Sequence, residues 1–244
     1  MDTVGNQEDK RYVKLTNDLL FYMVFSMNEE ARKDLVSCLL GIPASEIEGV
    51  KLLNPIQYNN SIDTRQTIMD LKIHLKNSTF IFVEIQVNRF RFFTNSTLIY
   101  GCRNIESQLY GKKDYTNILP VIQVSIMDHT LFPEHKVFYD VYKIQGNDHQ
   151  VLTDKLKFIV LDLTAVSKAT EDDKERGLVQ WAEAFNAGDW ETIRKIERPG
   201  IKEAVKTMEG IMANPTQRDL VWNRHLALMD YNSELIRARE EGRD

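Results

Sequence analysis

Apolar residues follow a helical spacing near the two ends of the chain and a strand-like spacing in the middle. Residues 17–40 open with a capping signal at Asn17 and keep apolar residues on one helical face. They predict two helices with a break within 26–28. Residues 67–75 and 80–87 are rich in β-branched and aromatic side chains and are joined by four polar residues, which predicts a β-hairpin.

The same patterns predict the remaining elements and their order. Further helices are expected at 93–110, 177–186, 189–197, 201–212 and 215–239. Further strands are expected at 50–53, 118–127, 137–144 and 157–162. This order is typical of an α/β fold. Because β-branched runs end near residue 170, we expect a core domain at 1–170 and a helical C-terminal region at 171–244, packed on the core or extending from it.

Composition narrows the class of protein. A chain of 244 residues with 43% hydrophobic residues can bury one sizeable core. Its two cysteines, Cys38 and Cys102, lack CxxC spacing, which argues against a disulfide framework or a structural zinc site. The first sixteen residues are charged throughout, and no apolar run reaches about 18 residues. We therefore expect a cytoplasmic protein with no membrane partner.

Charge leaves the type of partner open. The formal net charge of −5 counts mildly against a nucleic-acid partner, but most of the excess acid lies in residues 171–244. Within 88–113, five basic residues stand against Glu106 alone. This segment is either a patch that faces phosphates or an ordinary solvated helix face.

Two carboxylates lie inside runs that otherwise predict buried strands. These are Asp70 and Glu84, and Glu84 shares a strand face with Gln86 because strand side chains alternate. A buried carboxylate is costly without a partner or a metal. Two carboxylates and a backbone carbonyl on adjacent strands are typical of a Mg²⁺ or Mn²⁺ site. In the alternative interpretation, Asp70 pairs with Lys72 or an arginine and Glu84 lies on an exposed face.

The register of the hairpin separates these interpretations, because opposed residues point to the same side. A two-residue turn at Asn77 and Ser78 would oppose Asp70 to Ile85, and no site could form. A three-residue connection centred on Asn77 opposes Asp70 to Glu84. A connection centred on Ser78 opposes Asp70 to Gln86. The metal-site hypothesis therefore requires an odd connection or a bulge.

Several strings occur in an order that resembles one known family. They are NDLLFYMVF, LLNP, TIMDLKIHL, FVEIQV, QLYGKKDYTNILPVIQVSIMD, LKFIVLDLT and LVQWAEAF, spread over residues 14–190. Together they resemble the recombination-promoting nuclease (Rpn) and putative transposase branch of the PD-(D/E)XK nucleases. The resemblance implies a restriction-endonuclease-like core, a mixed central sheet flanked by helices, with a C-terminal helical appendage.

The resemblance also implies roles for individual residues. Asp70 and Glu84 correspond to the family's metal ligands, with the Ile85 carbonyl beside them. Gln86 stands where many relatives outside this branch have lysine, and it could orient water or phosphate without supplying charge. Asp18 resembles an additional acidic residue near the metal.

Other residues extend or weaken this assignment. Lys72 shares the strand face of Asp70, and we hypothesise that it supplies the missing positive charge. Ser96 appears where relatives commonly have arginine, which weakens the phosphate contacts expected of that helix. The residues expected to contact the DNA backbone are Arg91, Arg103, Lys112 and Lys113.

The predicted function is a Mg²⁺- or Mn²⁺-dependent DNA endonuclease with weak sequence preference, linked by the resemblance to recombination or mobile elements. The alternative is a catalytically inactive nuclease-fold protein that acts as a DNA-binding or protein-interaction module. The net acidity, Gln86 and Ser96 favour this alternative. The sequence does not separate DNA from RNA as substrate, and it leaves the oligomeric state open, a dimer included.

Overall fold

A five-stranded mixed sheet forms the centre of the computed structural model, which describes residues 11–47, 71–75, 79–86, 93–109 and 115–242. The strands are β1 (Leu71–His74), β2 (Phe80–Gln86), β3 (Val121–Met127), β4 (Tyr139–Gln145) and β5 (Val151–Asp162). Their order across the sheet is β1-β2-β3-β5-β4. The strand predicted at 50–53 lies outside the described residues.

Strand direction divides the sheet into a parallel centre and two antiparallel edges. β2, β3 and β5 run parallel, β1 is antiparallel to β2, and β4 is antiparallel to β5. The predicted hairpin is confirmed in its described part, where the Leu75 amide donates to the Thr79 carbonyl at 2.9 Å. The carboxyl ends of the three parallel strands meet at one edge of the sheet, which is where ligands bind in many α/β proteins.

The two predicted N-terminal helices are present, with their break at Asn28. Helix α1 (Asp18–Met27) begins at Asn17, whose side chain accepts a hydrogen bond from the Leu20 amide. Asn28 ends α1 and caps α2 (Glu29–Leu40) by accepting from the Ala31 amide. Side-chain oxygens at these positions satisfy helix amides that have no carbonyl partner, so the cap residues determine where each helix begins.

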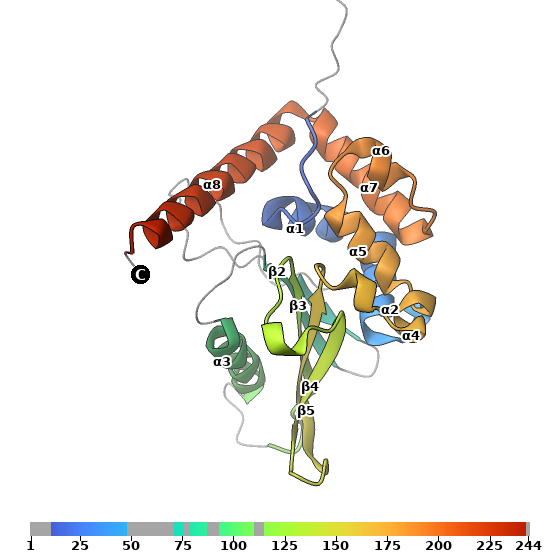
Figure 1. Cartoon of the computed structure of the whole chain (residues 1–244). Coiled ribbons are helices and arrows are strands. Elements are labelled where there is room, and N and C mark those ends of the chain that lie inside the picture. Colours follow the sequence, from blue (N-terminus) through green and yellow to red (C-terminus); the bar gives the residue numbers. More distant parts are fainter. Residues whose placement is uncertain (1–10, 48–70, 76–78, 87–92, 110–114, 243–244) are drawn as a thin grey trace, which may run out of the picture.

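Helices from both ends of the chain cover one face of the sheet (Figure 1). We call this the helix-covered face. Its strands present apolar side chains that are almost fully buried, among them Leu71, Ile73, Ile81, Val83, Val124, Ile126 and Leu161. These side chains form one continuous core with the apolar faces of α1, α2, α5 (Leu178–Asn186) and α7 (Pro199–Ala213).

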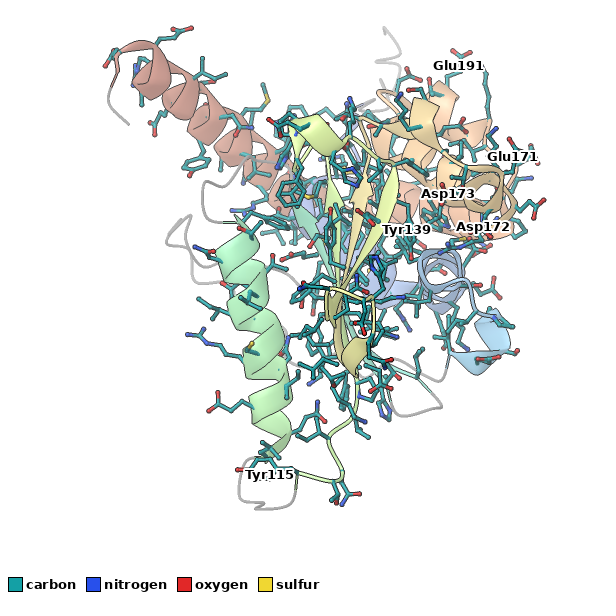
Figure 2. The ribbon with its side chains drawn as sticks, turned by 60° about the horizontal axis from the view of Figure 1, so that its bottom comes forward. Tyr115, Tyr139, Glu171, Asp172, Asp173 and Glu191 are labelled. Atoms are coloured by element: carbon teal, nitrogen blue, oxygen red, sulfur yellow. The ribbon has the colours of Figure 1, made fainter. Side chains whose placement is uncertain are left out.

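The C-terminal helices therefore complete the core of the N-terminal helices. On α2, the Asp34 carboxylate accepts from Trp181 Nε1 at 2.9 Å and from Arg198 at 2.6 and 2.9 Å. Near α4 (Glu171–Glu175), which the sequence pattern did not predict, Arg176 stacks over the Tyr139 ring at 4.6 Å. Figure 2 labels Tyr139 and, on α4, Asp172 and Asp173. The proposed boundary at residue 170 stays a prediction, because the core crosses it.

Two helices complete the C-terminal region. They are α6 (Trp190–Arg194) and α8 (Pro215–Glu240), and the far half of α8 extends beyond the other helices (Figure 1). Short 3-10 turns lie at Ala44–Glu46, Ser107–Leu109, Pro133–His135 and Val166–Lys168. In the part of the chain that the structure describes, no helix is long and apolar enough to span a membrane.

Helix α3 (Phe93–Glu106) lies on the opposite face of the sheet (Figure 1). We call this the α3 face. Gly101 allows the close approach: a Cβ atom at this position would lie 2.9 Å from the Leu156 side chain and 3.2 Å from that of Phe158. A small apolar cluster, separate from the main core, contains Phe82, Val121 and Leu156 beneath this helix.

Candidate active site

Glu84 is buried on the α3 face, near the carboxyl end of β2. Its side chain is 3% exposed, so the interpretation that placed it on an exposed strand face is wrong. Directly opposite on β3, the Ser125 hydroxyl donates to Glu84 Oε1 at 2.7 Å. The Thr97 hydroxyl of α3 makes a longer contact of 3.4 Å with the same oxygen. The carboxyl is thus held through one of its two oxygens.

Burial changes the chemistry of this carboxyl group. Removal from water raises the pKa of Glu84 above its ordinary value, and contacts with Ser125, Thr97 and Gln123 oppose that rise. Among the described residues, no cationic side chain forms an ion pair with Glu84. A bound cation stabilises a buried carboxylate more than it stabilises a carboxylate in water.

The register of β1 and β2 is the one that a connection centred on Asn77 predicts. Leu71 pairs with Val83, and Lys72 pairs with Phe82. Leu71 is the first described residue of β1, so Asp70, the other predicted metal ligand, lies outside the described residues. The two-residue turn that would have excluded a site is ruled out, because that turn requires a register shifted by one residue.

Lys72 lies on the α3 face but not against Glu84. Its ammonium sits 4.7 Å from the Phe80 ring centroid and 5.1 Å from that of Phe82, as a cation–π contact. Burial lowers the pKa of Lys72. Since Phe80 and Phe82 precede Glu84 on β2, the ammonium lies toward the end of the strand away from the carboxyl group.

Asp18 forms an ion pair with the C-terminal helix. Arg224 of α8 donates through Nε to both Asp18 oxygens, at 2.9 and 3.1 Å, and through a terminal nitrogen to Oδ2. Both side chains are mostly buried. The structure therefore gives Asp18 a role in fixing α8 against α1, and its predicted role beside a metal stays a prediction.

The predicted DNA-contacting residues are only partly described. Arg103 is exposed on α3, whereas Arg91, Lys112 and Lys113 lie outside the described residues. Ser96 donates its hydroxyl to the Phe93 carbonyl one helical turn earlier.

Two other predicted site residues lie at the end of β2. Gln86 and Ile85 continue the parallel pairing of β2 with β3, opposite Met127 and Ile126. Figure 2 shows Tyr115, which is exposed, beyond the C-terminal end of α3.

Sequence reasoning missed the polar contribution of β3. Ser125 and Gln123 are each 1% exposed and share the α3 face with Glu84. The signal was present, because both interrupt an apolar strand at a spacing of two residues, as Glu84 and Gln86 do in β2.

A second buried carboxylate, Asp162, ends β5 on the same face. Its Oδ1 accepts from the Thr164 amide at 2.8 Å and from the Thr164 hydroxyl at 2.7 Å, so it stabilises the turn after the strand. Within the described ranges, no group of three or more histidine, cysteine, aspartate or glutamate side chains could hold a metal. A complete metal site therefore needs a ligand from outside these ranges, and Asp70 is the candidate.

The mixed five-stranded sheet with helices on both faces has the restriction-endonuclease-like α/β fold. The family model described as "PD-(D/E)XK nuclease family transposase" matches residues 15–238, and the chain belongs to this family. No curated protein and no solved structure matches the chain significantly. PD-(D/E)XK nucleases generally use divalent metal ions.

Proposed function

We propose that this chain is a metal-dependent endonuclease that hydrolyses DNA phosphodiester bonds. The observation that supports it most directly is the Glu84 carboxyl, which is buried, unpaired with any described cation and hydrogen-bonded through Oε1. The remaining oxygen can bind a hard cation such as Mg²⁺ or Mn²⁺. In a family of nucleases, a costly buried carboxylate is best explained by its use in catalysis.

Asp70 is the proposed second ligand. It directly precedes Leu71, and Glu84 directly follows Val83, the partner of Leu71. Continuation of this register by one residue would oppose Asp70 to Glu84, with both side chains on the α3 face. The Ile85 carbonyl would provide a third oxygen. Asp18 is kept as a proposed accessory residue, although it is paired with Arg224.

A divalent cation held by these oxygens would make a bound water more acidic and would neutralise charge on the phosphate. Gln86 would orient the attacking water or the scissile phosphate by hydrogen bonding. Lys72 would add positive charge only if its ammonium moved from its place over the two phenylalanine rings. The DNA backbone would be contacted by Arg103 and by Arg91, Lys112 and Lys113, with weak sequence preference. The link to recombination or mobile elements belongs to the same proposal.

The test is cleavage of supercoiled plasmid by the full chain with Mg²⁺, Mn²⁺ or EDTA. We expect nicking that requires metal and that falls at least about 100-fold in Asp70→Asn and in Glu84→Gln, because each removes a charged metal ligand. Glu106→Gln is the matched control, since Glu106 is exposed on α3, and it should cleave at the wild-type rate. Lys72→Ala tests the hypothesis that Lys72 assists, which equal cleavage would reject.

A folded wild type that binds DNA without cutting it would favour the inactive DNA-binding module instead. Two features support that alternative: Gln86 is uncharged, and the Lys72 ammonium lies over the Phe80 and Phe82 rings. Neither places a positive charge beside Glu84. Cleavage that survives both carboxylate substitutions would show that the site is elsewhere. Parallel assays on RNA would decide the class of nucleic acid.

A further inference from the structure

Strand β3 places two polar side chains next to Glu84, in a sheet position where apolar residues would be expected. Ser125 lies in the same row across the sheet as Glu84, and Gln123 lies one row earlier. That earlier row contains Phe82 on β2 and Phe158 on β5, so the Gln123 amide is flanked by two aromatic residues. Neither polar side chain has a part in the proposed chemistry so far.

The described hydroxyl contacts to the Glu84 carboxylate reach only one of its two oxygens. Both hydroxyl contacts, from Ser125 and from Thr97, reach Oε1. No described side chain makes an ordinary hydrogen bond to Oε2. Because one oxygen is fixed, the orientation of the other is fixed as well, which is how residues behind a metal ligand tune its affinity.

Gln123 presents the stronger anomaly. Its side chain is 1% exposed, and neither its amide nitrogen nor its amide oxygen has a hydrogen-bond partner of normal geometry among the described residues. The amide nevertheless lies close enough to the Glu84 carboxyl to lower its pKa. An unsatisfied buried amide is destabilising, and a methionine would fill this place without that cost. Because the Gln123 amide destabilises the fold, its presence is better explained by a functional role than by packing.

We propose that Ser125 and Gln123 are positioning residues for a divalent cation at Glu84. Ser125 holds Oε1, and the Gln123 amide donates to the carboxylate when the cation draws Oε2 toward itself. This inference rests on the proposed metal site. It adds that the strand beside the ligand strand, and not the ligands alone, sets the affinity for metal.

The test measures Mn²⁺ binding to the full chain by isothermal titration calorimetry, together with thermal unfolding in EDTA. We expect Ser125→Ala to raise the dissociation constant for Mn²⁺ by about 10–100-fold and Gln123→Met to raise it by about 10-fold. Gln123→Met should also raise the unfolding temperature in EDTA by about 2–4 °C, because it removes the unsatisfied amide. Ser96→Ala is the matched control, since that hydroxyl binds only the Phe93 carbonyl, and it should keep wild-type affinity.

The outcomes separate the inference from the proposed function. If wild type binds no Mn²⁺ or Mg²⁺, the metal site itself is wrong, and this inference falls with it. If wild type binds Mn²⁺ and both variants bind equally well, only the positioning role is wrong. A lower unfolding temperature for Gln123→Met with unchanged affinity would show that Gln123 is a packing residue. If Ser125→Ala does not fold, Gln123→Met decides the question alone.

Discussion

The helix-covered face and the α3 face of the sheet differ in what their strands bury. On the helix-covered face, neighbouring strands bury Val83, Val124 and Leu161 in the core that they share with several helices. On the α3 face, residues of the same strands bury Glu84, Ser125 and Gln123 beneath one helix. Because side chains alternate along a strand, one sheet carries an apolar surface and a surface with buried polar groups back to back.

This difference shows how the fold can tolerate a costly site. Apolar burial contributes roughly 25 cal/mol per Å², and most of the large fully buried side chains belong to the main core. The α3 face contributes a smaller apolar cluster and carries the polar groups that apolar residues could replace. We infer that the helix-covered face supplies most of the stability and that the polar groups of the proposed site on the α3 face offset part of it.

Leucine truncation on each face tests this division and should give the largest effect. Leu161→Ala, in the main core, should lower the free energy of unfolding by about 3–5 kcal/mol, since it leaves a cavity among packed helices. Leu156→Ala, in the small cluster on the same strand, should cost about 2–3 kcal/mol. Urea unfolding measures both. Equal costs would mean that the two faces contribute alike.

The seat of α3 gives an intermediate effect. Gly101→Val should cost about 1–3 kcal/mol, because the new side chain meets Leu156 and Phe158 where helix and sheet touch. Gly210→Val is the matched control, since a Cβ at this helical glycine meets nothing within 4 Å, and it should change stability by no more than about 0.5 kcal/mol. Similar losses at both positions would argue that α3 packs loosely.

The smallest expected effect is a gain in the free energy of unfolding, whereas the preceding substitutions lower it. The folded-state pKa of Glu84 is raised, so its contribution to stability is complete below the ordinary value of 4.5 and is lost as pH rises through the folded-state pKa. In EDTA at about pH 8, Glu84→Gln should therefore be more stable than wild type by at least about 1 kcal/mol.

The difference between Glu84→Gln and wild type should vanish at about pH 4, where both side chains are neutral. Urea unfolding at the two pH values measures it. A variant less stable than wild type at about pH 8 would show that the α3 face does not carry a cost at Glu84.

Local patterns predicted the elements well, because helices and strands depend on the spacing of residues close in sequence. The break at Asn28 and the hairpin of β1 and β2 followed from caps and alternation. The position of β5 between β3 and β4 did not, since strand order depends on packing between distant segments. The length of β5 was also underestimated, because its first half is largely exposed and does not alternate cleanly between apolar and polar residues.

The candidate site divides in a similar way. Glu84 was found because a carboxylate in an apolar strand is conspicuous, and its burial was settled only by the structure. The pairing of Asp18 with Arg224 joins residues 206 positions apart, which no local pattern reveals. Ser125 and Gln123 were overlooked because neutral polar residues in a strand attract less notice than charges, although their spacing was the same.

The bonds from Asp34 to Trp181 and Arg198 also govern the timing of folding during synthesis. They join residues 147 and 164 positions apart, and the apolar sides of α1 and α2 are filled only by α5 and α7. At about 5–20 residues per second, the ribosome needs roughly 7–33 s to make that intervening chain. Throughout this interval the nascent N-terminal helices have no complete core to join. The native core can therefore close only after α5 and α7 have been synthesised.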